Sequence, residues 1–573
     1  MKRLFYAACM LAAANGEAAF YTEQDCQQRI HAHLLIHDLA TACQEAREAA
    51  GLYPHSALVR RAQIEAFAKA GEEAAMWNAW VSYSQDFPPT DEQTREIAEC
   101  MAWGVINKAA GSSSPIIRTL ALLAALFSQD AKGIGIIQHS MQDTNTFVRG
   151  AAVQLAANLR DAQIHDEVLR VLRNESNWKV HLEAIKSAGK MRLKEAQPDL
   201  VAMAADPKSS AEEVAIAVQS LVVILDDVSL EKLTPLVNSN RAGLRVLACE
   251  LVAHRVEPEA IPLLVPLLHD THPQVRAAAV YALGVLRAPE ARQPAKGLLN
   301  DLDPSTAMMA AWVTLYHYPE EGQEAFRQLL NHPQVDIQRR AAGVLAATGK
   351  KGVPVMREQF YLHNDPYVKV NLAFGLIAQR VDVEAAANAL QQAHATLPER
   401  WMWDEATPFR ALMPSKVKHD ELIPNYPEAV NQQVRLEVLN VLAILKHPKA
   451  QDEVKRFLQE RSWGVTGLAS ALLLTEGDDA AVDIVTALLA DPNKKVRMQA
   501  ALILSLWGGG EEALSVLEGS YSTADREMKE KILESVGRVG NKQSIPFLID
   551  KLQEPPQTLR IIAAAALLQT LYH

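Results

Sequence analysis

One short pattern, a Val-Arg pair or a close equivalent, recurs through most of the chain at nearly constant spacing. Most of its steps are 31 or 32 residues or about twice that length, and the pattern extends over some 450 residues. It occurs at Ile117-Arg118, Val148-Arg149, Val180, Leu244-Arg245, Val275-Arg276, Ile337, Val368-Lys369, Val434-Arg435, Val465, Val496-Arg497, Met528-Lys529 and Leu559-Arg560. A fixed period of this length is typical of a solenoid, in which each unit contacts mainly the next unit. The chain is therefore better interpreted as one extended stack than as several globular domains.

The segment around Asp270 shows what one unit contains. Apolar residues at helical spacing follow Pro273, which suits a first helical turn because proline lacks the N–H that stays unpaired there. They are Val275, Ala279, Ala282, Leu283 and Leu286. Just upstream lies a second stripe of the same kind, formed by Ile261, Leu264, Val265 and Leu268. This spacing predicts two short helices joined by a tight turn.

The composition agrees with close packing of helices. Hydrophobic residues make up 49% of the chain but aromatic residues only 6%, and there are 26 glycines in 573 residues. A disordered chain would be less apolar, and an all-β protein would be richer in aromatic residues. Small side chains such as alanine let neighbouring helices approach closely, so the predicted fold class is all-α, an α-α superhelix.

The repeated unit resembles a HEAT repeat, close to the short bacterial variety. The resemblance is carried by a turn with Asp and Pro followed by the Val-Arg start of a second helix. These residues stand as Asp270, Pro273, Val275 and Arg276, as Asp491, Pro492, Val496 and Arg497, and, without the proline, as Asp143 and Arg149. The resemblance covers roughly residues 113–573 and implies that the Asp and Arg side chains form a ladder between repeats. Arg149, Arg276 and Arg497 are therefore expected to be structural.

The N-terminal stretch has a different pattern. Leu58, Ala62, Ala66, Gly71 and Trp80 resemble the small and large packing positions of a tetratricopeptide repeat. We expect a cap of helical hairpins of this kind over residues 22–110, joined to the HEAT-like array near the segment GSSSP.

The first residues, MKRLFYAACMLAAANGEAAF, have the features of a secretory signal peptide over residues 1–18. Lys2 and Arg3 precede an apolar run that is too short to span a bilayer, and small residues follow it. This pattern predicts a periplasmic or secreted protein without stable membrane insertion after cleavage. The alternative is an alanine-rich first helix that is retained in a cytoplasmic protein.

The cysteines allow one prediction that depends on export. Cys26 and Cys43 can face each other across a helical hairpin, and an oxidising compartment would permit a disulfide between them. The alternative is that both are small buried thiols.

The period breaks between Val368 and Val434, where the step is 66 residues. The irregular segment near residues 395–430 concentrates aromatic side chains in a chain that has few of them: Trp401, Trp403, Phe409 and Tyr426. Aromatic residues of this kind are favoured as anchors in protein interfaces. The segment is thus a candidate partner-binding loop, or else a degenerate repeat whose aromatic residues fill a gap in the stack.

No motif in the sequence indicates catalysis. The chain has neither HExxH nor G-x-S-x-G, and His33 and His37 have no carboxylate nearby at metal-ligand spacing. The 57 basic and 68 acidic residues give a net charge of −11, which argues against a nucleic-acid partner. We therefore expect no catalytic residue, cofactor or metal, and a protein–protein interaction scaffold with a long concave surface. The alternative is a HEAT-like lyase or isomerase that acts on a bound small molecule.

Overall fold

A computed structural model describes residues 21–87, 90–128, 130–206, 208–225, 229–404, 407–415, 426–460, 479–505 and 508–572. Residues 1–18, predicted to be a signal peptide, and Val465 lie outside these ranges. The chain divides into two units: residues 1–137 together with 529–573, and residues 138–528.

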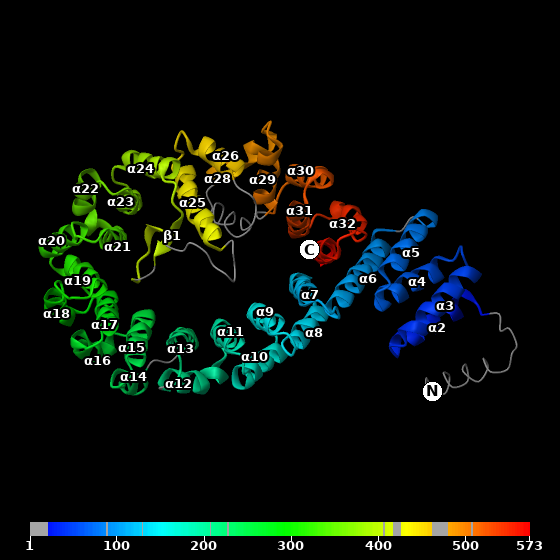
Figure 1. Ribbon diagram of the computed structural model, residues 1–573, viewed down its shortest axis with the longest axis horizontal. Helices are drawn as coiled ribbons and strands as arrows, with labels where there is room; N and C mark the ends of the chain where they lie inside the picture. The colour runs from blue at the N-terminus through cyan, green and yellow to red at the C-terminus, as the bar shows by residue number, and fades with distance from the viewer. Residues whose placement is uncertain are drawn as a thin grey trace. The chain divides into compact units, whose positions relative to one another are not determined.

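Unit 2, residues 138–528, is a stack of helix pairs, as the period predicts (Figure 1). The first helices are α8 (Ala131–Ser140), α10 (Ala162–Asn174), α12 (Gln197–Ala205), α14 (Leu230–Val237), α16 (Ile261–Leu264) with η4 (Val265–His269), α18 (Arg292–Gly297), α20 (Pro319–Leu330), α22 (Val353–Leu362), α24 (Val383–Thr396), α26 (Ala450–Glu460), α28 (Asp479–Ala487) and α30 (Glu511–Ser520). The second helices are α9 (Thr146–Ala156), α11 (Trp178–Lys190), α13 (Ala211–Ile224), α15 (Ala242–Arg255), α17 (Pro273–Val285), α19 (Pro304–His317), α21 (Val335–Ala346), α23 (Pro366–Ala378), α25 (Tyr426–Ile444) and α29 (Lys494–Ser505). Short 3-10 helices connect several of them: η2 (Lys194–Ala196), η3 (Pro258–Ala260), η5 (Pro289–Ala291), η6 (Gly349–Gly352), η7 (Leu488–Ala490) and η8 (Tyr521–Thr523).

The second helices from α9 to α23 lie along the concave side of unit 2, and the first helices lie along its convex side (Figure 1). The apolar residue of the recurring pair faces into the stack. It is buried in each of the described repeats that we compared, at Val148, Val180, Val275, Ile337, Val368 and Val496. The predicted all-α superhelical fold is confirmed, with one β-hairpin in the described part of unit 2.

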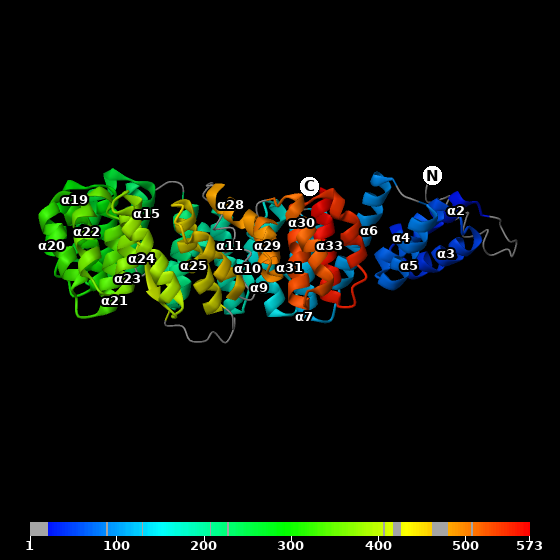
Figure 2. The ribbon, with the colours of Figure 1, turned by 90° about the horizontal axis from the view of Figure 1, so that it is seen from above.

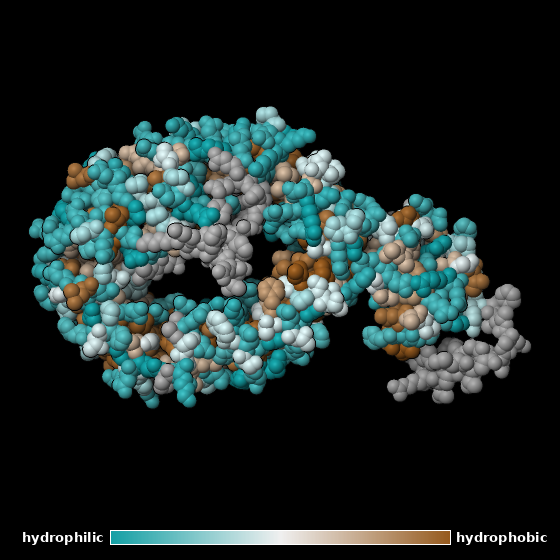
Figure 3. Space-filling model, in the orientation of Figure 1, coloured by the Kyte–Doolittle hydropathy of each residue, from teal (hydrophilic) through white to brown (hydrophobic). Residues whose placement is uncertain are grey.

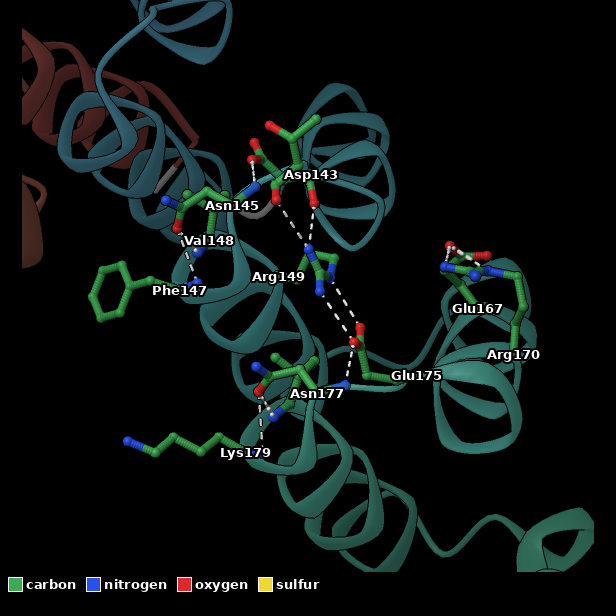
Figure 4. Close-up of polar contacts among 12 residues, drawn as sticks. Asp143, Asn145, Phe147, Val148, Arg149, Glu167, Arg170, Glu175, Asn177 and Lys179 are labelled. Atoms are coloured by element: carbon green, nitrogen blue, oxygen red, sulfur yellow. Dashed lines mark hydrogen bonds and ion pairs between the residues drawn. The ribbon is translucent and has the colours of Figure 1, made fainter.

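The arginines of the recurring pair join successive repeats, as the resemblance implied. Arg149 donates to both carboxylate oxygens of Glu175, at 2.9 and 3.0 Å, and to the carbonyl oxygen of Asp143. Glu175 in turn accepts the backbone N–H of Asn177 (Figure 4). The same arrangement recurs at Arg245–Asp270 and Arg276–Asp301. In the repeat of Ile337 the two roles are divided, because Arg339 pairs with Asp365 while Gln338 donates to the carbonyl oxygen of His332.

Arg497 keeps part of this arrangement, because it donates to the carbonyl oxygens of Asp491 and Pro492. The structural interpretation of Arg149, Arg276 and Arg497 is confirmed.

Unit 1 combines the two ends of the chain. Its helices are α2 (Glu23–Leu35), α3 (Leu39–Leu52), α4 (Ala57–Ala70), α5 (Glu73–Asp86), α6 (Asp91–Ala110), α7 (Pro115–Ser128), α31 (Arg526–Val539), α32 (Ile545–Lys551) after η9 (Lys542–Ser544), and α33 (Gln557–Tyr572). The helices α2 to α5 lie side by side as pairs (Figure 2). This is the geometry that the tetratricopeptide-like cap requires, and the assignment to that repeat type stays a prediction.

The last helix, α33, packs against α6 and α7 as well as against α32. The indole N–H of Trp103 in α6 donates to the hydroxyl of Tyr572 at 3.4 Å. The apolar residues of α33 are consequently buried around most of its circumference.

Cys26 and Cys43, the pair considered for a disulfide, are both buried free thiols in this structure. The thiol of Cys43 donates to the carbonyl oxygen of Ala66, and burial raises the pKa of Cys43 to about 11. Among the described helices, none is both long and apolar enough to cross a bilayer.

Candidate functional site on the second helices

A β-hairpin occupies the place where the period breaks. Strand β1 (Trp401–Asp404) pairs antiparallel with β2 (Ala411–Pro414), with Trp401 opposite Pro414 and Asp404 opposite Ala411. Strand β2 packs against α21 and α23, and β1 packs against α25. The hairpin thus lies on second helices.

The base of the hairpin is held by buried polar groups. The side chain of Asn431 accepts both the backbone N–H of Trp401 at 2.9 Å and the guanidinium of Arg435 at 3.1 Å. Arg435 also donates to the backbone carbonyl oxygens of His394, Leu397 and Glu399, and its guanidinium lies 4.3 Å from the centre of the Trp401 ring. These bonds satisfy backbone groups of the segment that enters the hairpin.

The edge of β2 is bound by one side chain. The Oδ1 atom of Asn371 accepts the backbone N–H of Leu412 at 2.7 Å, and its Nδ2 atom donates to the backbone carbonyl oxygen of the same residue at 3.0 Å. Asn371 is buried on α23, so both bonds are shielded from water. A side-chain amide that makes both bonds replaces the neighbouring strand that a sheet edge would otherwise need.

Aromatic and charged contacts hold the rest of the hairpin. The ring centre of Phe409 lies 5.1 Å from that of Trp312 in α19 and 5.9 Å from that of Tyr281 in α17. These distances are in the range preferred by aromatic pairs. Asp404 forms an ion pair with Arg340 of α21 at 2.9 Å.

Trp403 lies half-buried beside Phe374 of α23. Its indole N–H donates to Glu437 at 2.7 Å, and the guanidinium of Arg410 lies 4.4 Å from its ring centre. The hairpin therefore contributes aromatic and acidic side chains to a surface that supplies aromatic side chains, arginines and one amide.

The hairpin contacts follow the repeat register. Tyr281, Trp312, Gly343 and Phe374 are spaced 31 residues apart. Tyr281, Gly343 and Phe374 each lie six residues after the apolar residue of a recurring pair, and Trp312 lies six residues after Thr306, which takes that place in its repeat. At Gly343 the hairpin backbone lies directly against the helix, because an added Cβ atom would be 2.7 Å from the carbonyl oxygen of Arg410. We call these positions, together with those three residues after the apolar residue, the inner columns. Arg340 and Asn371 occupy the latter.

The predicted site residues differ in their burial and in their contacts. Trp401 is 0% exposed and packs against Tyr367 and His394, which corrects the expectation of an exposed anchor at that position. Trp403 and Phe409 pack onto second helices. Tyr426 begins α25, and its side chain lies outside the described part of the structure.

Sequence reasoning missed the helix residues that receive the hairpin. Tyr281, Trp312 and Asn371 lie in ordinary repeats, and the spacing of 31 residues among the aromatic ones was the signal that could have found them.

One pocket of about 410 Å³ lies between α9 and α10 of neighbouring repeats, lined by residues that include Gln142, Arg149, Arg170 and Glu175 (Figure 4). Its charged groups are bound to one another. Arg149 holds Glu175, while Arg170 and Gln142 both donate to Glu167. In the described ranges, no group of three or more His, Cys, Asp or Glu side chains is arranged to hold a metal ion.

Three stretches of the chain match the family of HEAT repeats, residues 134–221, 230–315 and 482–569, so the chain contains HEAT repeats. Among solved structures, the chain is similar to the Kap95:Nup1 complex, with 12% identity over 99% of this chain and 86% of that chain and a TM-score of 0.36. It is also similar to Kap121p bound to Nup53p, with 12% identity over 89% of this chain and 76% of that chain and a TM-score of 0.30. These TM-scores are too low to bear on function. A search of curated protein sequences gives no match.

Proposed function

We propose that this protein is a non-enzymatic scaffold whose second helices bind an extended segment of a partner protein. The observation that carries this proposal is the pair of hydrogen bonds between the Asn371 amide and the backbone of Leu412. A side chain that hydrogen-bonds to the backbone N–H and C=O of one residue can bind an extended peptide largely independently of the peptide's sequence. The hairpin is thus a segment of extended chain bound by the concave side of its own repeats.

The neighbouring contacts add selectivity to this backbone recognition. Tyr281 and Trp312 receive the ring of Phe409, and Arg340 receives the carboxylate of Asp404. Aromatic and arginine side chains supply much of the binding energy in protein interfaces. The inner columns therefore provide the chemistry of a peptide-binding surface.

The alternative of a lyase or isomerase has less support. Such a reaction needs a polar group that is free to act on a ligand, whereas the charged side chains of the described pocket are committed to ion pairs with one another.

We also propose that the protein is exported. Lys2, Arg3 and the apolar run that follows them support this, and residues 1–18 lie outside the described part of the structure. The partner would then be another envelope protein or, after secretion, a host protein. N-terminal sequencing of the protein from its native cell tests the proposal. A mature chain that begins after Ala18 supports export, and a chain that retains Lys2 would instead make the protein a cytoplasmic adaptor.

Site-directed photo-crosslinking in the native cell tests the scaffold. A photoreactive amino acid is placed at Gln154, an exposed inner-column position on α9, and in a second variant at Asp166, which is exposed on the first helix α10. We expect a defined partner to be cross-linked from Gln154 and not from Asp166. Cross-links from Asp166 alone would contradict binding on the second helices.

A further inference from the structure

The hairpin covers only part of the second-helix surface of unit 2. Its described contacts are with α17, α19, α21, α23 and α25. The second helices α9 and α11 belong to the same stack, and their inner-column positions carry no hairpin residue in the described part of the chain. The surface formed by the second helices therefore continues beyond the part that the hairpin covers.

Exposed aromatic residues lie at the N-terminal ends of these two helices. The side chain of Phe147 is 65% exposed and that of Trp178 is 57% exposed. Both lie in the first turn of a second helix. Asn145 and Asn177 are the N-cap residues of these two helices. Aromatic side chains of this kind supply much of the binding energy in protein interfaces. Most of the face shown in Figure 3 is hydrophilic, with scattered hydrophobic patches.

Basic side chains follow the same face of α11. Lys179, Lys186 and Lys190 are separated by seven and four residues, so they form one stripe along the helix. Lys186 occupies the same register position as Tyr281 and Trp312, the residues that receive the hairpin. In Figure 4, Phe147 and Lys179 both point away from α10, hence away from the first helices.

The charge of this stripe is largely uncompensated. Lys186 forms an ion pair with Glu183 at 2.7 Å, and the ammonium group of Lys190 donates to the side-chain oxygen of Asn158. Within the described ranges, neither Lys179 nor Lys190 lies within ion-pair distance of a carboxylate. Three lysines and one glutamate thus give α11 a net positive face in a chain whose total charge is −11.

The bound hairpin indicates what this face would take. On the covered helices the bound segment supplies an aromatic ring, Phe409, and a carboxylate, Asp404. On the uncovered helices the surface offers exposed aromatic rings and ammonium groups, which complement the same two chemical groups. We propose that Phe147, Trp178, Lys179, Lys186 and Lys190, here called the aromatic–basic surface, bind an acidic segment of a partner protein that contains an aromatic residue. This inference rests on the scaffold function proposed above.

Fluorescence anisotropy with a defined probe tests the inference. The probe is a fluorophore-labelled, glutamate-rich synthetic peptide with one central phenylalanine. Two control peptides replace the phenylalanine by serine or every glutamate by lysine. We expect the full-length protein to bind the acidic aromatic peptide, and we expect Trp178→Ala and the double variant Lys179→Glu/Lys190→Glu each to weaken binding about tenfold or more. Lys208→Glu makes the same charge change at an exposed position off the stripe and should leave the affinity unchanged.

Each other outcome overturns the inference. If the serine peptide binds with the same affinity as the phenylalanine peptide, charge attraction alone accounts for binding. If Trp178→Ala leaves the affinity unchanged, the peptide binds at another site. Binding that is lost instead with Tyr281→Ala would move it to the hairpin helices and leave the scaffold proposal standing. No binding up to about 1 mM peptide would also overturn it, and it would leave open the crosslinking result at Gln154, which reports on the scaffold independently. Circular dichroism of each variant confirms that the helices remain folded.

Discussion

The guanidinium of Arg560, in the last helix, forms an ion pair with the carboxylate of Glu73, in α5, with 2.7 Å between Nε and Oε2. Arg560 is the arginine of the last recurring pair, and it donates to the carbonyl oxygens of Glu554 and Pro555 as the other ladder arginines do to their own turns. At Arg149, Arg245 and Arg276 the turn of the next repeat supplies the acid. For Arg560, the acid comes instead from α5, a helix near the other end of the sequence that belongs to the same unit.

Removal of the Glu73 carboxylate should release α33 from the N-terminal helices. Glu73 and Arg560 are mostly buried, so Glu73→Ala leaves a cation without its partner and should destabilise unit 1 by about 2 kcal/mol. Faster hydrogen exchange of the amides in α33 measures this effect. Glu72→Ala is the matched control. The carboxylate of Glu72, the residue before Glu73, pairs with Arg47 at an exposed position, where an ion pair contributes at most about 1 kcal/mol to stability. Equal exchange in the two variants would contradict a structural role for the Arg560–Glu73 pair.

A methyl group at Gly343 should detach the hairpin from α21. The added Cβ would lie 2.7 Å from both the Cβ of Ala411 and the carbonyl oxygen of Arg410, a distance at which the strand must move. We expect Gly343→Ala to accelerate tryptic cleavage after Arg410 about tenfold, which corresponds to about 1.4 kcal/mol of easier local opening. In Gly150→Ala, on the second helix α9, the new methyl group meets Val180 at an ordinary 3.7 Å. That variant should be cleaved at the wild-type rate, and the same rate for Gly343→Ala would show that the hairpin does not press on the helix.

The repeat could be predicted from the sequence because its determinants are local. Pro273 and Val275 lie within one helix, and a stripe of apolar residues at helical spacing is sufficient to identify it. The pairing of Arg276 with Asp301, which joins adjacent repeats, agrees with the ladder that the resemblance to HEAT repeats implied.

The contacts that create the candidate site are not local, which is why they could not be predicted. Phe409 meets Tyr281 and Trp312 across several repeats, and no spacing rule connects a hairpin to the helices it folds back on. One feature of the sequence could have indicated that α33 is packed on several sides. The segment from Leu559 to Leu568 is apolar nearly all round, which predicts a helix that is covered on most of its sides.

Truncation of the two hairpin tryptophans should reduce stability by different amounts, because Trp401 lies in the core and Trp403 lies at the surface. Trp401 is fully buried, so Trp401→Ala should destabilise unit 2 by about 3–5 kcal/mol. Trp403 remains partly exposed and should contribute less than half as much on truncation. Urea unfolding followed by circular dichroism measures both, and Trp401→Phe, which retains much of the buried volume, should fall between Trp401→Ala and the wild type. A larger loss at Trp403 than at Trp401 would contradict the observed burial.

The ladder should make part of the stability depend on pH in the acid range. The two bonds from Arg149 hold the pKa of Glu175 below its ordinary value, against the opposing effect of burial. A carboxylate whose pKa is lower in the folded state stabilises the fold above its unfolded pKa of about 4.5, and this contribution is lost as the pH falls through the folded pKa. Glu175→Gln should therefore lower stability by about 2 kcal/mol at pH 7 and by progressively less as the solution is acidified below about pH 4.5. Urea unfolding of both proteins at a series of pH values measures the difference. Asp166→Asn removes an equal charge from the exposed face of α10 and controls for the change in net charge. A difference between wild type and Glu175→Gln that stays constant down to pH 3 would contradict the assignment of this pH dependence to the Arg149–Glu175 pair.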